Sequence, residues 1–220
     1  MTKSSYARRV AAAVGCAAVL AVGLLVAGCG SASPTEVVTA ELDAASGVTH
    51  DDLAAALRGE EVENEIVADF VSDMDMQEML GTDEVTQEQA DQMADFLAKL
   101  CDYDYEIGEE TIDGDTAEVE VTFTTYDFGT MYSESIDTAI NELLETDGIY
   151  EMSDSEIESL SAQTFLRVLS EGSNALTDKS QTKTTTLTLT KKDGQWELDD
   201  LSQDATDAMT GGLMSAIDSL

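Results

Sequence analysis

The spacing of apolar residues changes at Asp102, from about 3.6 residues before it to two residues after it. Beyond this point the apolar side chains alternate with acidic residues and threonines: Tyr103, Tyr105 and Ile107, then Ala117, Val119, Val121 and Phe123. Asp113-Gly114 lies between the two runs, and Asp-Gly is a strong signal for a tight hairpin turn. The sequence therefore predicts an antiparallel hairpin over 102–126 with one apolar face and one acidic face.

A second hairpin is predicted over 183–199. Leu187 and Leu189 alternate with threonines, Asp193-Gly194 supplies the turn, and Trp196 begins the returning strand. Two hairpins with matching apolar faces predict one four-stranded antiparallel sheet, whose acidic and threonine-rich face meets water.

Helices are expected on both sides of the first hairpin in the sequence. Apolar residues at helical spacing follow Pro34 and Thr49, continue over 66–80, and follow a capping box at Thr86 and Gln89. Two helices are expected between the hairpins, over 136–144 and from a capping box at Ser153 onward, and one last helix from about Ser202, weakened at Gly211-Gly212. These helices need an apolar surface to cover, so we predict a single α+β domain over 36–220.

Residues 1–28 have the order of a secretory signal peptide. Lys3, Arg8 and Arg9 stand near the start with no acidic residue, and 10–28 contain only Ala, Val, Gly, Leu and one Cys. The small residues that follow, Gly-Ser-Ala-Ser-Pro-Thr, carry no charge that would stop transfer. We therefore predict a signal peptide over 1–28 and a flexible tether over 29–35.

The end of this segment, Leu25-Val26-Ala27-Gly28-Cys29, resembles the lipobox of bacterial lipoproteins. The resemblance implies diacylglycerol on the Cys29 sulfur and cleavage between Gly28 and Cys29, which would hold the domain on the outer face of the cell membrane. An uncleaved N-terminal anchor is the alternative, and it also tethers the protein to a membrane. Arg8-Arg9 leaves the twin-arginine export route open beside the general one.

The charge of the chain limits its partners. Removal of 1–28 leaves seven Lys and Arg residues against 46 Asp and Glu residues, a net charge of −39. Such a surface repels nucleic-acid phosphates and anionic lipid headgroups, so we predict no nucleic-acid partner. A cationic protein or bound cations would relieve the repulsion. Cys101 is then the one thiol left besides the lipidated cysteine, so no internal disulfide is expected and Cys101 is expected to be buried.

No known catalytic or phosphate-binding motif follows Cys29, and no cofactor or metal is predicted. Asp73, Asp75 and Glu84 imitate a calcium loop that lacks its glycine, and His50 is the single histidine. The residues that would line an enzymatic pocket on the sheet are Tyr103, Tyr105, Tyr126, Asp104 and Asp127. Tyrosines at alternating strand positions more often belong to the core, with their hydroxyls at its rim.

The later half of the chain resembles a family of Gram-positive bacterial lipoproteins of uncharacterised activity. The similarity rests on a Tyr-rich strand, an Asp-Gly hairpin, a long helical insertion and the last hairpin, Lys191-Lys192-Asp193-Gly194-Gln195-Trp196. It implies a cystatin-like or nuclear-transport-factor-like domain in which Trp196 packs under a curved sheet.

We therefore expect a lipid-anchored, extracytoplasmic, non-enzymatic binding or envelope-associated module. Two alternatives remain open at this point. One is a solute-binding or small-molecule enzyme domain that uses the concave face of the sheet. The other is a structural spacer that dimerises through the sheet.

Overall fold

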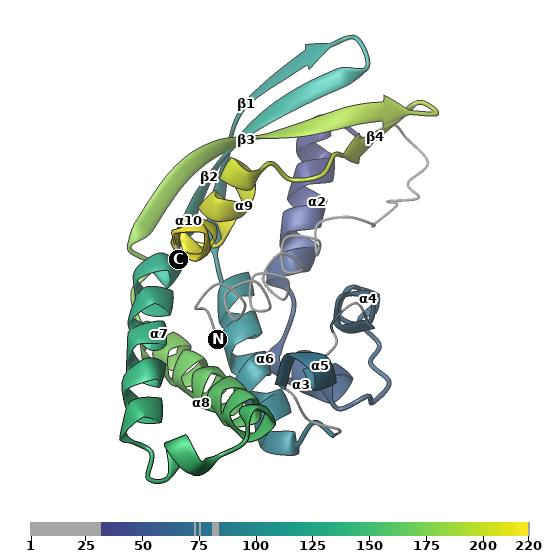
Figure 1. Cartoon of the computed structure of the whole chain (residues 1–220). Helices are drawn as coiled ribbons and strands as arrows, with labels where there is room; N and C mark the ends of the chain where they lie inside the picture. Colours follow the sequence, from purple (N-terminus) through teal and green to yellow (C-terminus); the bar gives the residue numbers. More distant parts are fainter. Residues whose placement is uncertain (1–31, 73, 75, 81–83, 220) are drawn as a thin grey trace.

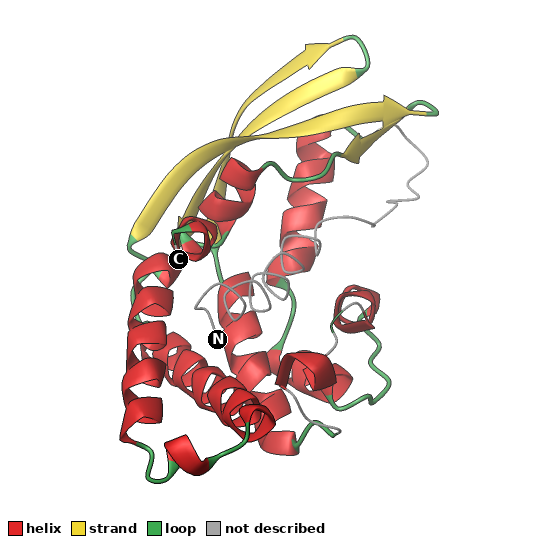
Figure 2. Ribbon diagram, in the orientation of Figure 1, coloured by secondary structure: helices red, strands yellow, loops and turns green. Residues whose placement is uncertain are grey.

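The computed structural model describes residues 32–72, 74, 76–80 and 84–219. Four antiparallel strands form one sheet in the order β1-β2-β3-β4, and helices lie against it and extend away from it (Figure 1, Figure 2). The strands are β1 (Asp104–Asp113), β2 (Thr116–Thr125), β3 (Gln181–Lys192) and β4 (Gln195–Leu198). The predicted α+β fold and both predicted hairpins are confirmed.

The two faces of the sheet differ as the alternation predicts. Val119 pairs with Leu187 and Ala117 with Leu189, and all four side chains are buried. Between them, Glu118 pairs with Thr188 on the opposite, exposed face. Because successive side chains of a strand point to opposite faces, the helices cover the apolar face and leave the acidic and threonine-rich face in water.

A β-bulge in β1 breaks this alternation. The register shifts between Ile107, which pairs with Val121, and Glu110, which pairs with Val119. Gly108 and Glu109 therefore stand opposite Glu120 alone, and a Cβ atom at Gly108 would lie 2.7 Å from Glu120 Oε1. The extra residue turns Glu110 toward the face that carries the helices, a position that the period of two does not predict.

The helices lie near their predicted places, and the N-terminal caps are clear. The capping box at Thr86 is confirmed, because Thr86 N donates to Gln89 Oε1 at 2.9 Å and Gln89 N donates to Thr86 Oγ1 at 3.2 Å. The box at Ser153 and Glu156 is confirmed as well. The apolar stripe over 66–80 is divided between two short helices. The helix bounds are α2 (Pro34–Ser46), α3 (His50–Leu57), α4 (Glu65–Ser72), α5 (Met76–Leu80), α6 (Gln87–Cys101), α7 (Phe128–Glu145), α8 (Asp154–Ala175), α9 (Gln203–Met209) and α10 (Leu213–Asp218), with a 3-10 turn, η2, at Ile149–Glu151.

The last predicted helix is wrong in one respect. Instead of one helix weakened at Gly211-Gly212, the chain forms α9 and α10 and turns sharply between them. Gly211 has φ +56° and Gly212 has φ +83°, a left-handed conformation that favours glycine. Gly129 N, at the start of α7, donates to Gly211 O at 3.1 Å. The glycine pair therefore joins the C-terminal helices to α7.

The helices form three groups around the core. In Figure 1, α2 and α9 lie beneath the sheet, whereas α7 and α8 form a long antiparallel hairpin that extends away from it. The third group is α3 to α6, in which α3 packs against α4 and α6, and α5 and α6 contact α8. Trp196 lies on the core face of β4, with the Lys191 ammonium 5.2 Å from the centroid of its ring, but the side chain is only partly buried.

Candidate functional site

The predicted lipidation site, Gly28 and Cys29, lies outside the described residues, but the start of the folded domain close to it is well defined. Helix α2 begins at Pro34, two residues before the predicted domain boundary at residue 36. Ser33 N donates to Glu36 Oε2 at 2.8 Å, and Glu36 N donates to Ser33 Oγ at 3.2 Å. These two bonds form a capping box, and the bonds from the Ser33 backbone and hydroxyl lower the pKa of Glu36.

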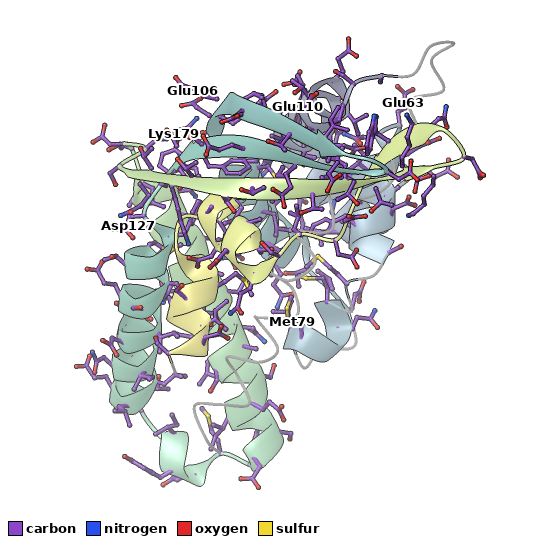
Figure 3. All side chains as sticks on the ribbon, turned by 90° about the horizontal axis from the view of Figure 1, so that it is seen from above. Glu63, Met79, Glu106, Glu110, Asp127 and Lys179 are labelled. Atoms are coloured by element: carbon purple, nitrogen blue, oxygen red, sulfur yellow. The ribbon has the colours of Figure 1, made fainter. Side chains whose placement is uncertain are left out.

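The first turn of α2 is also tied to the sheet through the bulged strand. Glu110 Oε2 accepts hydrogen bonds from Thr35 N at 3.0 Å and from Thr35 Oγ1 at 2.6 Å. Figure 3 shows Glu110 on the sheet. A carboxylate beside the N-terminus of a helix also interacts favourably with the helix dipole. The structure thus fixes the beginning of the domain against β1, six residues after Cys29.

The tyrosines of β1 and its approach, which were candidates for a pocket, hold the strand against α2. The Tyr103 hydroxyl is buried and donates to Leu42 O at 3.0 Å, and the Tyr105 hydroxyl donates to Asp43 Oδ1 at 2.6 Å. Burial raises the pKa of Tyr103, and burial together with the bond to Asp43 raises the pKa of Tyr105 to about 12. Both phenols remain protonated donors at neutral pH, which suits a structural role.

Tyr126 belongs to a different group, which the sequence did not reveal. Its hydroxyl donates to Asp102 Oδ2 at 2.7 Å, and Lys179 Nζ lies 2.9 Å from Asp102 Oδ1 and 3.0 Å from Asp104 Oδ1. Lys99 Nζ sits 4.0 Å from the centroid of the Tyr126 ring, a cation–π contact. We call these five residues the Tyr126 cluster. It joins the end of α6, the start of β1, the connection between β2 and α7, and the connection between α8 and β3.

The charges of the Tyr126 cluster compensate one another. Burial alone would raise the pKa of Asp102, but the hydrogen bonds from Tyr126 and Lys179 outweigh it and lower that pKa. Burial would likewise lower the pKa of Lys179, but its bonds to Asp102 and Asp104 raise it. Both shifts move away from neutrality, whereas a general acid or base works best with a pKa near the operating pH. The cluster is therefore better suited to holding four segments together than to proton transfer.

The five predicted pocket residues do not share one site. Asp104 and Tyr126 belong to the Tyr126 cluster, whereas Tyr103 and Tyr105 bond to α2. Asp127 caps α7 by accepting from Thr130 N at 3.0 Å. Figure 3 labels Asp127 and Lys179, and the side-chain hydrogen bonds of Asp127 go to Thr130 rather than to the Tyr126 cluster. The two lysines of the cluster are two of seven basic residues expected in the mature chain, but no local pattern marks them as partners.

Asp207, on α9, is a second charged group that sequence reasoning missed. Its carboxylate is buried, and it accepts from Ser215 N at 2.8 Å and lies 3.1 Å from Lys183 Nζ. Burial opposes ionisation, but the bonds from Ser215 and Lys183 prevail and lower the pKa of Asp207. The residue thus caps α10 and connects it to β3.

We expect Asp207→Asn to cost about 1–2 kcal/mol at pH 7, because the carboxylate makes charge-assisted bonds that an amide replaces only in part. The folded pKa lies below the unfolded value of about 3.9, so this stability is present above that pH and is lost as pH falls through the folded pKa. Urea unfolding from pH 7 to pH 3 should show the difference from wild type shrinking below about pH 4. The exposed Asp147→Asn should stay within about 0.5 kcal/mol throughout; a constant deficit for Asp207→Asn would contradict the assignment.

His50 is a remaining sequence candidate that lies among the described residues. His50 Nδ1 lies 3.3 Å from Asp51 Oδ1 and its Nε2 lies 3.4 Å from Asp95 Oδ1. Among the residues that the structure describes, no group of three or more His, Cys, Asp or Glu side chains could hold a metal ion. Asp73 and Asp75 of the calcium-like segment lie outside them. Cys101 is buried as expected, and burial raises the pKa of its thiol to about 12.

None of the helices within the described ranges is long and apolar enough to cross a membrane. No protein-family model matches the sequence, and no curated protein matches it. The chain is similar to a solved structure from Bacillus subtilis subsp. subtilis str. 168, described as "a putative lipoprotein (ycdA)", with 19% sequence identity and a TM-score of 0.39. The similarity covers 80% of this chain and 58% of the Bacillus protein, so the chain spans little more than half of that protein's length.

Proposed function

We propose that this protein is a lipoprotein held on the extracytoplasmic face of the cell membrane by diacylglycerol on Cys29. We further propose that its domain is a non-enzymatic binding or envelope-associated module. The observation that carries the proposal is Leu25-Val26-Ala27-Gly28-Cys29 at the end of an apolar segment that follows Lys3, Arg8 and Arg9. Two acyl chains give stable anchoring where one chain is marginal, at about 0.8 kcal/mol for each buried CH2.

The position of the folded domain supports a short tether. Helix α2 begins at Pro34, and the Ser33–Glu36 capping box together with Glu110 holds its first turn in place. Only residues 29–32 then separate the lipid from the cap, a reach of about 14 Å at most. The start of α2, and the side of the sheet to which it is tied, would thus stay close to the membrane.

The chemistry of the domain supports binding rather than catalysis. The tyrosines and carboxylates that were candidates for a reaction bond to other protein groups and hold segments together. In contrast, Leu144 and Tyr150 expose large apolar surfaces that the fold does not use. Exposed apolar surface with a polar surround is typical of sites that bind other proteins.

Cys29→Ser tests the lipid anchor. We expect the variant to lose metabolic labelling by an alkyne analogue of palmitate, and to leave the membrane fraction or to accumulate as uncleaved precursor, because the thioether needs the Cys29 sulfur. Cys16→Ser, which changes a cysteine inside the apolar segment, is the matched control and should keep full labelling. Persistent labelling and unchanged fractionation of Cys29→Ser would refute lipidation at this residue.

A further inference from the structure

The α7–α8 hairpin ends in an exposed apolar surface. Three large apolar side chains are exposed among the described residues: Tyr150 at 88%, Leu144 at 60% and Ile112 at 52%. Tyr150 and Leu144 belong to the segment 142–158, which we call the tip, while Ile112 lies near the β1–β2 turn. Leu143, Ile149, Met152 and Ile157 are partly exposed in the same segment. The tip therefore concentrates apolar surface that the fold leaves in water.

The tip is a built structure rather than a loose loop. Gly148 takes φ +78° and begins η2, in which Glu151 N donates to Gly148 O at 2.9 Å. Thr146 Oγ1 donates to Glu142 O at 3.0 Å at the end of α7. The capping box at Ser153 then starts α8 at once. Tyr150 is thus presented from a hydrogen-bonded turn. A turn whose backbone is already ordered loses less conformational entropy on binding than a loose loop does, and Tyr is enriched among the residues that dominate binding energy.

The negative charge of the tip limits the kind of partner that it can bind. Seven of its residues are Asp or Glu and none is Lys or Arg: Glu142, Glu145, Asp147, Glu151, Asp154, Glu156 and Glu158. The nearest arginine in the sequence, Arg167, is paired with Glu142 and with Glu171. A segment in which exposed apolar side chains alternate with acidic ones is complementary to an apolar pocket bordered by Lys and Arg. Anionic lipid and nucleic acid are repelled by this negative charge, and a second copy of the chain would bring the same charge.

We propose that the tip docks, through Tyr150 and Leu144, into an apolar pocket bordered by basic residues on another extracytoplasmic protein. Figure 1 places the tip at the opposite end of the molecule from the sheet, to which the start of α2 is tied by Glu110. On a protein tethered at Cys29, the tip would point away from the membrane, where a protein partner can reach it. The proposal deepens the proposed function and rests on it for the location of the partner.

The test is photocrosslinking in living cells of the source organism, using the full-length chain with p-benzoylphenylalanine in place of Tyr150. We expect an adduct with one protein and no comparable adduct when the same probe replaces Ile112. The crosslinked protein is then purified, and its affinity for the full chain is measured at low and at high salt. Tyr150→Ser and Leu144→Ser should each weaken binding about tenfold or more, Ile112→Ser should change it less than about twofold, and added salt should weaken it.

Four results would overturn the proposal: no adduct above the position-112 control, an adduct with lipid or with a second copy, an affinity that Tyr150→Ser leaves unchanged, or a partner surface without basic residues. An adduct alone does not support it, because the affinity changes are required as well. The Cys29 labelling experiment separates the two hypotheses. If labelling fails while the tip variants lose affinity, the lipid anchor is wrong and the docking surface stands.

Discussion

Gly211→Ala is expected to lower the free energy of unfolding by at least about 3 kcal/mol, or to prevent folding. Gly211 has φ +56°, and a Cβ atom there would lie 2.0 Å from the carbonyl oxygen of Tyr126 and 2.9 Å from Thr125 Oγ1. Backbone cannot swing aside as a flexible side chain does, so the α9–α10 turn would have to leave the end of β2. Urea unfolding followed by circular dichroism measures the loss.

Gly114→Ala is the matched control, because it separates the steric cost from the conformational one. Gly114 has φ +64°, close to that of Gly211, but a Cβ atom there would meet nothing within 4 Å. Its substitution should cost only about 1–2 kcal/mol, the price of a left-handed conformation for a residue with a side chain. Equal losses for the two variants would show that the contact between Gly211 and Tyr126 does not limit the fold.

The glycine pair illustrates what local sequence patterns omit. Gly211-Gly212 is recognisable as a weak point in a helix from propensity alone. The pair instead makes a turn against Tyr126 and Gly129, and these two residues lie more than 80 positions earlier in the sequence. The same holds for β1, whose alternation is visible up to Ile107 but whose bulge is defined only by pairing with β2.

The strands and most helices could be predicted because their signals are local. A period of two, an Asp-Gly turn and a capping box each involve residues within a few positions of one another. Even so, the division of the C-terminal helix was not predicted, because packing against α7 overrides the local periodicity.

For the candidate site, too, local motifs could be predicted and contacts between distant segments could not. The lipobox at Cys29 is a local motif and remains a sequence prediction. The alternation places Tyr103 on the face of the sheet that meets the helices, but its hydroxyl bonds to Leu42, far away in the sequence. The Tyr126 cluster likewise gathers Lys99 and Lys179 from separate segments. In a chain with 46 acidic residues, no pattern tells which carboxylates these lysines will meet.

Leu189→Ala is expected to lower the free energy of unfolding by about 3–4 kcal/mol. Leu189 is fully buried on β3, with Ala117 of β2 on one side and Leu198 of β4 on the other. Ala117 is too small to fill the space that the lost methyl groups would leave, so the variant loses burial and gains a cavity. A urea-unfolding loss below about 1.5 kcal/mol would contradict the close packing of this face.

Leu144→Ala removes the same atoms from an exposed position, so it should change stability by no more than about 0.5 kcal/mol. This comparison bears directly on the docking proposal, because an exposed side chain that contributes little to the stability of the fold can be assigned a role in binding. Suppose that Leu144→Ala leaves the free energy of unfolding unchanged while Leu144→Ser weakens the affinity for the crosslinked partner. The weakening then arises from a lost contact between Leu144 and the partner. If Leu144→Ala proves as costly as Leu189→Ala, the tip is part of the core, and its apolar surface needs no partner.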